Sequence, residues 1–494
     1  MSEPKRLHPV AAVSNVLTEL KNMFFPLIIV LFVNKGEKND IWDYIPIIVT
    51  AAAILFVLVS GVIKWLRFTY RVEAGELRIE YGLFVKKKRY IPIERIQSVD
   101  VSEGPLQQAF NLVKINIETA GSSANADSEA ELTAITKEEA AALEEIINRE
   151  KSKEYREEMD QDLPDSANAD RDPATVLYQA KLSDLLLLAA TSGGAGVVIS
   201  AVVAFLSQFS EFIPYEKVFK EASHLLESGV VFVSMLVVAV LFLAWLISVI
   251  LTLLKYYNFT VEMTEQDIVI KRGLLEKRQT TIPLSRVQGI VMVENPLRQL
   301  IGYSCVQVES AGGSAAEEGG TSFNILPMVK KWEAFQLLEN MFKDYSFPQQ
   351  FHPAPKRAAR RYMLRKSLYV LVPIMALSGF FWPHGLWSLL LLLLAAFYGM
   401  SCYRAAGWTI QDQQLSLRYR LFSRCTVFLK KSRIQSADLV QTYWQANKQL
   451  ATIEAVIKSG EGGRKTKMVD AERADAEKMY HWYQRNQSET QVKE

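Results

Sequence analysis

Three copies of one heptad organise this chain, and the first reads Ile91-Pro92-Ile93-Glu94-Arg95-Ile96-Gln97. The second reads Ile282-Pro283-Leu284-Ser285-Arg286-Val287-Gln288, and a degenerate third reads Leu429-Lys430-Lys431-Ser432-Arg433-Ile434-Gln435. Each copy follows a pair of apolar segments. An internal repeat of this kind indicates that the protein is built from repeated structural units. The sequence therefore predicts three equivalent units, each with an apolar pair followed by a soluble segment.

Further landmarks surround the heptads in the same register. The run Gly82-Leu83-Phe84 precedes the first copy, and its equivalents are Gly273-Leu274-Leu275 and Arg420-Leu421-Phe422. After the heptad come Pro105-Leu106-Gln107-Gln108 in the first unit and Pro296-Leu297-Arg298-Gln299 in the second. The third unit lacks both the heptad proline and the Pro-Leu landmark, so it is the most diverged.

The apolar segments have the length of membrane spans. The chain has 494 residues, of which 49% are hydrophobic, and its mean hydropathy is +0.06, between soluble and membrane-embedded values. A helix needs roughly 20 mostly apolar residues to cross the hydrocarbon core. We predict six spans in three hairpins, at 23–33 with an extension, 44–65, 185–206, 229–254, 367–382 and 386–403. The first is short, and its assignment rests on the pairs in the other two units.

Basic residues indicate the orientation, because lysine and arginine gather on cytoplasmic flanks. They are Lys5, Arg6, Lys21, Lys64, Arg67, Arg71 and the run from Lys356 to Lys366. The loop at 207–228 instead carries four glutamates and two lysines. We therefore expect a multi-pass cell-membrane protein whose termini and soluble units are all cytoplasmic. No cleavage site of small residues follows the first apolar segment, which favours an anchor over a removable signal peptide.

Each soluble unit has the pattern of strands closed by a helix. The first begins with the alternating run Glu76-Leu77-Arg78-Ile79-Glu80-Tyr81 and reaches the capping box Thr136-Lys137-Glu138-Glu139. We expect an α + β membrane protein in which each transmembrane hairpin precedes a small β-barrel or sandwich with a C-terminal helix. The predicted hairpins are 1–66, 183–254 and 367–403, and the domains are 67–150, 255–345 and 404–485. An acidic linker at 151–182, a basic linker at 346–366 and a tail at 486–494 complete the chain.

We expect no cofactor and no metal site. The cysteines Cys305, Cys402 and Cys425 are far apart, and no two histidines have the spacing of metal ligands. The glycine-rich stretches at 311–314 and 460–463 lack the Gly-Lys-Ser/Thr ending of a phosphate loop. A net charge of +2 gives no reason to expect nucleic acid.

Basic residues near the Gly-Leu-Phe turns are candidates for binding lipid or a partner. A cationic cluster at the cytoplasmic leaflet gains on the order of 1 kcal/mol per charge from anionic lipid. The candidates are Lys86, Lys87, Lys88, Arg89, Lys277, Arg278, Arg424 and Lys430. The alternative is ordinary positive-inside bias on solvated strand faces.

The repeat signature is expected to be mainly structural, with an anion contact at the recurrent arginine as the alternative. Its residues are Pro92, Arg95, Gln97, Pro283, Arg286, Gln288, Arg433 and Gln435.

With these landmarks, residues 67–150, 255–345 and 404–485 resemble the bacterial pleckstrin-homology-like (PH-like) domain, which follows paired transmembrane helices in bacterial membrane proteins. The whole architecture resembles the YdbT-type membrane proteins of bacilli. The resemblance implies a membrane location and a binding or scaffolding role, extending to tolerance of envelope stress such as cationic antimicrobial peptides. It brings no catalytic residues.

We therefore expect a non-enzymatic membrane scaffold. Its cytoplasmic domains would contact one another, anionic lipid of the cytoplasmic leaflet, or a partner membrane protein, self-association included. The alternative is a transporter or export component whose hairpins form a path. Ionisable residues are nearly absent inside the predicted spans, and this disfavours transport because proton relays need them.

Overall fold

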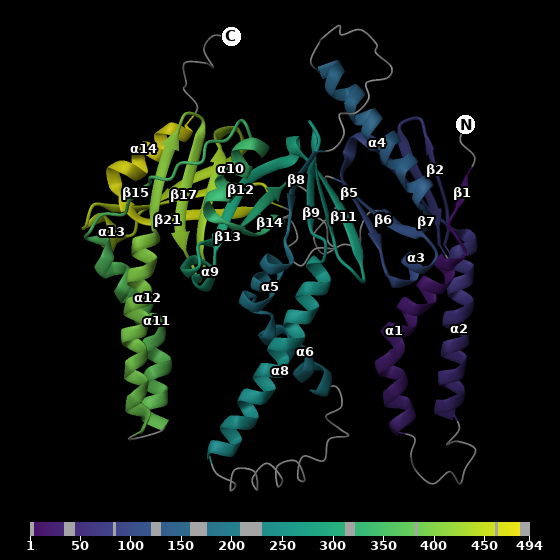
Figure 1. Cartoon of the computed structure of the whole chain (residues 1–494), viewed down its shortest axis with the longest axis horizontal. Coiled ribbons are helices and arrows are strands. Elements are labelled where there is room, and N and C mark those ends of the chain that lie inside the picture. The colour runs from purple at the N-terminus through teal and green to yellow at the C-terminus, as the bar shows by residue number, and fades with distance from the viewer. Residues whose placement is uncertain are drawn as a thin grey trace. The chain divides into compact units, whose positions relative to one another are not determined.

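A computed structural model describes residues 4–33, 45–82, 85–119, 130–158, 175–207, 230–311, 322–380, 384–459 and 463–484 of the chain. They form two compact units that cut across the sequence repeats (Figure 1). The first unit contains the first repeat together with Thr264–Pro283 of the second repeat. The second unit contains Thr175–Met263 and the rest of the second and third repeats. One repeat therefore contributes strands to both units.

Apolar helices occur where the sequence predicts membrane hairpins. They are α1 (Val10–Val33) and α2 (Ile45–Arg67) in the first unit, and α5 (Leu182–Thr191), α6 (Gly194–Ser207), α8 (Val230–Tyr256), α11 (Ala358–Phe380) and α12 (Leu390–Ala405) in the second. Within the described residues, four helices are long and apolar enough to cross a membrane, at Ile48–Arg67, Val233–Tyr256, Ala358–Phe380 and Leu386–Ala405. The bent pair α5–α6 would make a fifth. Of the six predicted spans, four or five are thus supported.

The continuous span predicted at 185–206 is wrong, because the helix breaks. Ser192 adopts extended backbone angles (φ −75°, ψ 139°) at the end of α5, and the two halves form an angle of 59°. A Cβ atom on Gly194 would lie 2.2 Å from the Ser248 hydroxyl of α8, so this glycine permits a close helix approach.

Two helices begin earlier than predicted. Arg360, Arg361, Arg365 and Lys366 of the predicted linker 346–366 lie in the first turns of α11, which begins at Ala358, since arginine and lysine are good helix formers. The first turn of α1 carries Val10 and Ala11 into the core of the first unit. Trp65 Nε1 donates a hydrogen bond of 2.8 Å to the Leu7 carbonyl, which fastens this N-terminal segment to α2.

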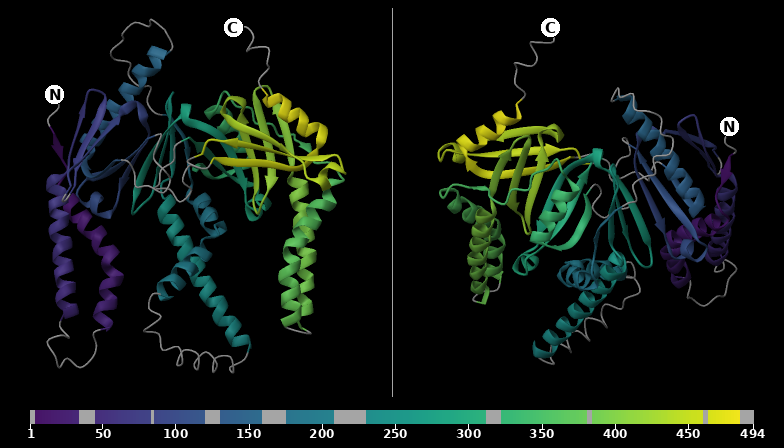
Figure 2. Two further views of the ribbon diagram at one scale, coloured as in Figure 1. Left: turned by 180° about the vertical axis from the view of Figure 1, so that it is seen from behind. Right: turned by 45° about the horizontal axis from the view of Figure 1, so that its top comes forward.

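The first unit contains strands of two antiparallel sheets around one core. One sheet has the order β1 (Lys5–Arg6), β2 (Thr69–Glu73), β3 (Glu76–Tyr81) and β4 (Lys87–Pro92). The other has the order β7 (Ala130–Thr136), β6 (Leu112–Thr119), β5 (Ile96–Glu103), β11 (Lys277–Pro283) and β10 (Asp267–Arg272). Leu77 and Ile91 of the first sheet share a buried cluster with Ile115 and Ile117 of the second. Helix α4 (Lys137–Glu158) packs on β6 and β7 (Figure 2).

The second unit repeats this arrangement. Its large sheet has the order β14 (Ser322–Lys330), β13 (Tyr303–Ser310), β12 (Val287–Glu294), β18 (Arg424–Lys430), β17 (Gln414–Arg420), β16 (Gly407–Gln411) and β15 (His352–Pro353). Its small sheet has the order β19 (Ile434–Val440), β20 (Leu450–Ile457) and β21 (Arg464–Glu472), while β8 (Thr175–Gln179) pairs with β9 (Thr260–Met263). Helix α10 (Lys331–Met341) packs on β13 and β14, and α14 (Arg473–Tyr483) packs on β19, β20 and β21. Within this unit, α8 and the α11–α12 hairpin leave the sheets on the same side (Figures 1 and 2).

The predicted α + β fold with terminal helices is confirmed, but the prediction of one self-contained barrel or sandwich per repeat needs correction. Each repeat divides its strands between two sheets, and consecutive repeats share a sheet. Half of the predicted acidic linker at 151–182, residues 159–174, lies outside the described residues, while its ends belong to α4 and to β8 with the start of α5.

Candidate functional site

The repeated heptad marks the crossing from one sheet to the next. In each repeat it ends a strand, makes one 3-10 turn and starts the following strand. The three turns are η2 (Ile93–Arg95), η4 (Leu284–Arg286) and η6 (Lys431–Arg433). We term the strand before the turn the incoming strand (β4, β11, β18), and the strand after it the outgoing strand (β5, β12, β19). This crossing explains why the heptad is repeated, because it sends one repeat into two sheets.

The first junction joins the outgoing strand of repeat one to the incoming strand of repeat two. Strands β5 and β11 are antiparallel, with Cα partners from Lys277↔Glu103 to Thr281↔Val99. Backbone pairing along five residues makes this a continuous sheet.

The second junction has the same register as the first. Strands β12 and β18 pair from Arg424↔Glu294 to Phe428↔Ile290, which are the positions equivalent to those of the first junction. At its end, the Arg424 guanidinium donates two hydrogen bonds of 2.5 and 2.6 Å to the Glu294 carboxylate. The Glu294 side chain is only 4% exposed, so this is a buried, bidentate ion pair. A cation on the incoming strand opposite a glutamate on the outgoing strand is thus common to both junctions.

The glutamine at the fourth position of the Pro-Leu landmark, Gln108 or Gln299, contacts the incoming hairpin of the next repeat. It lies on α3 (Pro105–Ala109) in the first repeat and on α9 (Pro296–Leu300) in the second. Gln108 Nε2 donates to the Leu275 carbonyl at 2.8 Å, and Arg420 donates to Gln299 Oε1. The sequence showed this landmark but not its partner, which lies in the following repeat.

Steric constraints require the glycine that precedes each of the first two incoming strands. Gly82 and Gly273 have φ values of +128° and +104°, and a Cβ atom there would lie 2.0 Å from a backbone carbonyl oxygen. Only glycine tolerates this turn. Arg420 occupies the equivalent position of the third repeat and is not among the residues with positive φ, so that turn is built differently.

Two side chains of the heptad signature make hydrogen bonds to backbone carbonyls, one between repeats and one local. Arg433 Nη2 donates to the Ser285 carbonyl at 2.8 Å, which ties the third turn to the second. Gln288 is buried and donates to the Arg286 carbonyl at 3.1 Å. Arg95 and Gln435 are exposed, and the side chain of Gln97 is outside the described part. Pro92 and Pro283 are the last residues of β4 and β11.

Most of the basic candidates have an acidic neighbour. Lys86 and Lys88 lie 2.6 and 3.4 Å from Glu80, and the hydrogen bond from Lys86 lowers the pKa of the Glu80 carboxyl. The remaining pairs are Arg278 with Glu276 at 2.8 Å and Lys430 with Asp344 at 3.1 Å. Lys87, Arg89 and Lys277 are exposed. The eight candidates are distributed over β4 with the preceding Lys86, over β11 and over β18.

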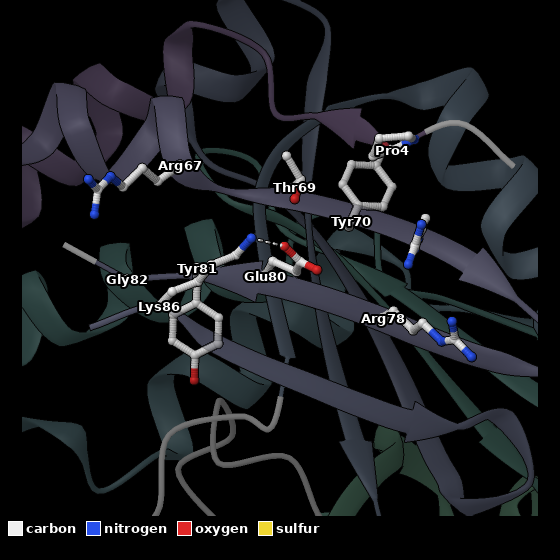
Figure 3. A pocket seen from close by; sticks show the side chains of 10 residues that line it. Pro4, Arg67, Thr69, Tyr70, Arg78, Glu80, Tyr81, Gly82 and Lys86 are labelled. Atoms are coloured by element: carbon white, nitrogen blue, oxygen red, sulfur yellow. Dashed lines mark ion pairs between the residues drawn. The ribbon is translucent and has the colours of Figure 1, made fainter. Parts of the chain in front are cut away.

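A pocket of about 590 Å³ lies beside the end of α2 in the first unit (Figure 3). It is lined by Pro4, Arg67, Thr69, Tyr70, Arg71, Arg78, Glu80, Tyr81, Gly82 and Lys86. Four of these are cationic and one is acidic, although Arg71 and Arg78 also lie 3.4 and 2.7 Å from Glu73. Arg67 is the last residue of the candidate span Ile48–Arg67, so the pocket lies beside the end of that span. Sequence reasoning found Lys86 but not the arginines contributed by β2 and β3.

The described residues show no group of three or more histidine, cysteine, aspartate or glutamate side chains arranged as metal ligands. The three cysteines are free and buried, and burial raises the pKa of the Cys305 thiol to about 11. Such a thiol is a weak nucleophile at neutral pH.

Comparison with known proteins agrees with this architecture. Residues 24–151, 193–344 and 368–487 match the family model described as bacterial PH domain, and each match includes an apolar pair or part of one. The chain therefore belongs to the bacterial PH-domain family, as its landmarks predicted. It is 38% identical over 493 residues to the UPF0699 transmembrane protein YdbT of Bacillus subtilis (strain 168), covering 98% of each chain. It is also 35% identical over 80 residues to the UPF0699 transmembrane protein YdbS of the same organism, covering 16% of this chain and 46% of that protein. The chain is thus a YdbT-like transmembrane protein with three bacterial PH-domain regions.

Proposed function

We propose that this protein is a non-enzymatic membrane scaffold that holds joined PH-like domains against the cytoplasmic leaflet, where they bind anionic lipid and partner membrane proteins. The observation that carries the proposal is the strand junction, which occurs twice with one register. A continuous sheet between repeats fixes their relative geometry, as a platform requires and as independently tethered enzyme domains do not. Tolerance of cationic antimicrobial peptides remains a prediction of the family resemblance.

The proposed orientation rests on the basic helix ends. In the second unit, Lys255 lies in the last turn of α8, Arg404 in the last turn of α12, and Arg360 near the start of α11. All three helix ends are on the side of the sheets, and this is the cytoplasmic side under the positive-inside rule. Lys465→Cys offers a test, because Lys465 is exposed in the third repeat and the natural cysteines are buried. A membrane-impermeant maleimide should label this variant only after cell lysis. Labelling of intact cells would show that the domains face outward and would refute the proposed orientation.

The lipid part of the proposal rests on the pocket at the end of α2. Its cations lie at a membrane boundary, where anionic headgroups attract basic side chains. We expect β2 and β3 of the full-length protein to exchange amide hydrogens more slowly in nanodiscs with phosphatidylglycerol than in phosphatidylcholine alone. Changing Arg71 and Arg78 to Gln should remove the difference, whereas Arg473→Gln on helix α14, which does not line the pocket, should keep it. Equal exchange in both lipids would refute headgroup binding.

The scaffold part is tested by opening a junction. We would crosslink intact membranes, purify the full-length protein and compare the retained membrane proteins and lipids between wild type, Arg424→Met and the control Arg473→Gln. Arg424 supports the second junction, while Arg473 pairs with Glu477 on the surface of α14. A scaffold predicts that Arg424→Met loses part of the retained set at equal membrane abundance. Identical sets in all three proteins would contradict the platform.

A further inference from the structure

The incoming strand of the first repeat has no strand on its outer edge among the described residues. Strand β4 ends its sheet, whereas the equivalent strands β11 and β18 each lie between two neighbours. Residues Lys87 to Tyr90 of β4 are all exposed, and Tyr90 exposes 52% of its surface. In β18, the equivalents Cys425 to Phe428 are buried. An unpaired strand edge is a template for pairing with another chain.

The first repeat has both features that the incoming strand of the second repeat has at its junction, a glycine with positive φ and a cation at the start of the strand. Gly82 forms the same positive-φ turn as Gly273, with the same 2.0 Å approach to a carbonyl. Lys86 stands at the position of Lys277 and Arg424, the cations that face a glutamate of the preceding repeat. Both outgoing strands that form junctions, β5 and β12, are already paired with β11 and β18, so a complement for β4 is sought in another molecule.

The third repeat lacks the two residues that the outgoing strands of the first two repeats have at their junctions, a glutamate and the glutamine of the Pro-Leu landmark. The glutamates Glu103 and Glu294 are replaced by Gln441, whose side chain donates to the Leu450 carbonyl at 2.8 Å within its own repeat. The glutamines Gln108 and Gln299 are replaced by Ala446. Strand β19 also ends its sheet. The chain is therefore equipped to accept a PH-like strand at β4 but poorly equipped to donate one from β19, and this asymmetry argues against a second copy as the occupant.

We propose that β4 is a docking edge for the outgoing strand of a PH-like domain in a separate membrane protein. The junction register defines the pairing: Lys86 faces a glutamate, and Tyr90 faces an apolar residue in the place of Val99 or Ile290. The cations of β4 favour an acidic partner strand, as β5 is with Asp100 and Glu103. The partial relative, a transmembrane protein of which 46% matches 80 residues of this chain, shows that a segment of this chain also occurs in a protein of a different overall build. The inference rests on the proposed scaffold role and names the kind of partner that one edge recruits.

Site-specific photocrosslinking of the full-length protein in native membranes tests the inference. Tyr90 would be replaced by p-benzoylphenylalanine, with Phe428 replaced in the same way as the control, because it holds the equivalent position inside the second junction. We expect an adduct at 90, absent at 428, in which mass spectrometry identifies a separate PH-domain protein linked through its outgoing strand. Lys86→Glu should reduce the adduct at least fivefold, whereas Lys465→Glu, an exposed lysine of the third repeat, should not.

Three other outcomes would overturn the proposal. An adduct with β19 of a second copy would make the edge a self-association surface. Adducts with lipid alone would assign β4 to the membrane. No adduct at 90 would mean that its lysines protect the edge from pairing. The Arg424→Met comparison tests the scaffold role independently of this crosslink. If that comparison supports a scaffold but position 90 gives no adduct, only the docking edge is refuted.

Discussion

Removing Arg424 should open the second junction, because it leaves the buried Glu294 carboxylate without its main counter-charge. The Glu294 side chain is 4% exposed and that of Arg424 is 18% exposed. Losing one partner of a buried ion pair costs about 3–5 kcal/mol. Lys331 Nζ lies 3.8 Å from Glu294 and keeps some compensation, so we expect a value of about 3 kcal/mol for Arg424→Met. Because 1.4 kcal/mol corresponds to a tenfold change in the equilibrium constant for opening, amide exchange in β12 and β18 should become roughly 150 times faster.

Hydrogen exchange with mass spectrometry, on the full-length protein in nanodiscs, measures this opening strand by strand. Peptides from β20 and β21 serve as internal controls, because these strands lie in the other sheet of the unit. The double variant Glu294→Met/Arg424→Met should recover most of the protection, since replacing both partners of a buried pair by apolar residues is often neutral. The reasoning is refuted if Arg424→Met changes exchange in β12 and β18 less than twofold, or if the double variant is as open as the single one.

Three further predictions concern other parts of the second unit. Gly399→Leu should separate α11 from α12, because even a Cβ atom would lie 2.7 Å from backbone atoms of α11, whereas Gly379→Leu, where nothing lies within 4 Å, should not; disulfide crosslinking between the helices would show the difference. Asp470→Ala should lower stability by about 3 kcal/mol, seen as earlier thermal aggregation in detergent, because this fully buried carboxylate accepts from two arginines of α11. Cys305 should resist N-ethylmaleimide at pH 8 in the folded protein and react only after unfolding, because its thiol is buried and has a pKa of about 11; rapid native labelling would contradict this.

The repeats, the strands with their terminal helices and most of the spans could be predicted because their signals are local. Alternation in a strand, a capping box and an apolar run each lie within a short window of sequence. The sharing of sheets between repeats could not be predicted this way. Glu294 and Arg424 are 130 residues apart, and Gln108 and Leu275 are 167 residues apart. Nothing near either residue of a pair identifies the other.

The basic candidates illustrate the same limit at the level of a site. Arg424 and Lys86 look alike in sequence, since both stand at the start of an incoming strand. In the structure, Arg424 is held by a buried glutamate of the preceding repeat, while Lys86 lies on an open edge beside a pocket. Which of them is available to a ligand depends on whether an outgoing strand covers it, and no pattern around the residue itself records that.

The junctions also bear on how the chain is made. Glu103 of β5 lies opposite Lys277 of β11, so the edge of β5 stays unpaired until a strand 174 residues further along the chain has been synthesised. Translation at about 5–20 residues per second makes this a delay of roughly 10–35 s. A transmembrane hairpin has to be inserted during that interval, because α5, α6 and α8 lie between the two strands. The first repeat therefore has an exposed sheet edge during synthesis, and the rates of translation and of hairpin insertion set how long that edge stays open to wrong partners.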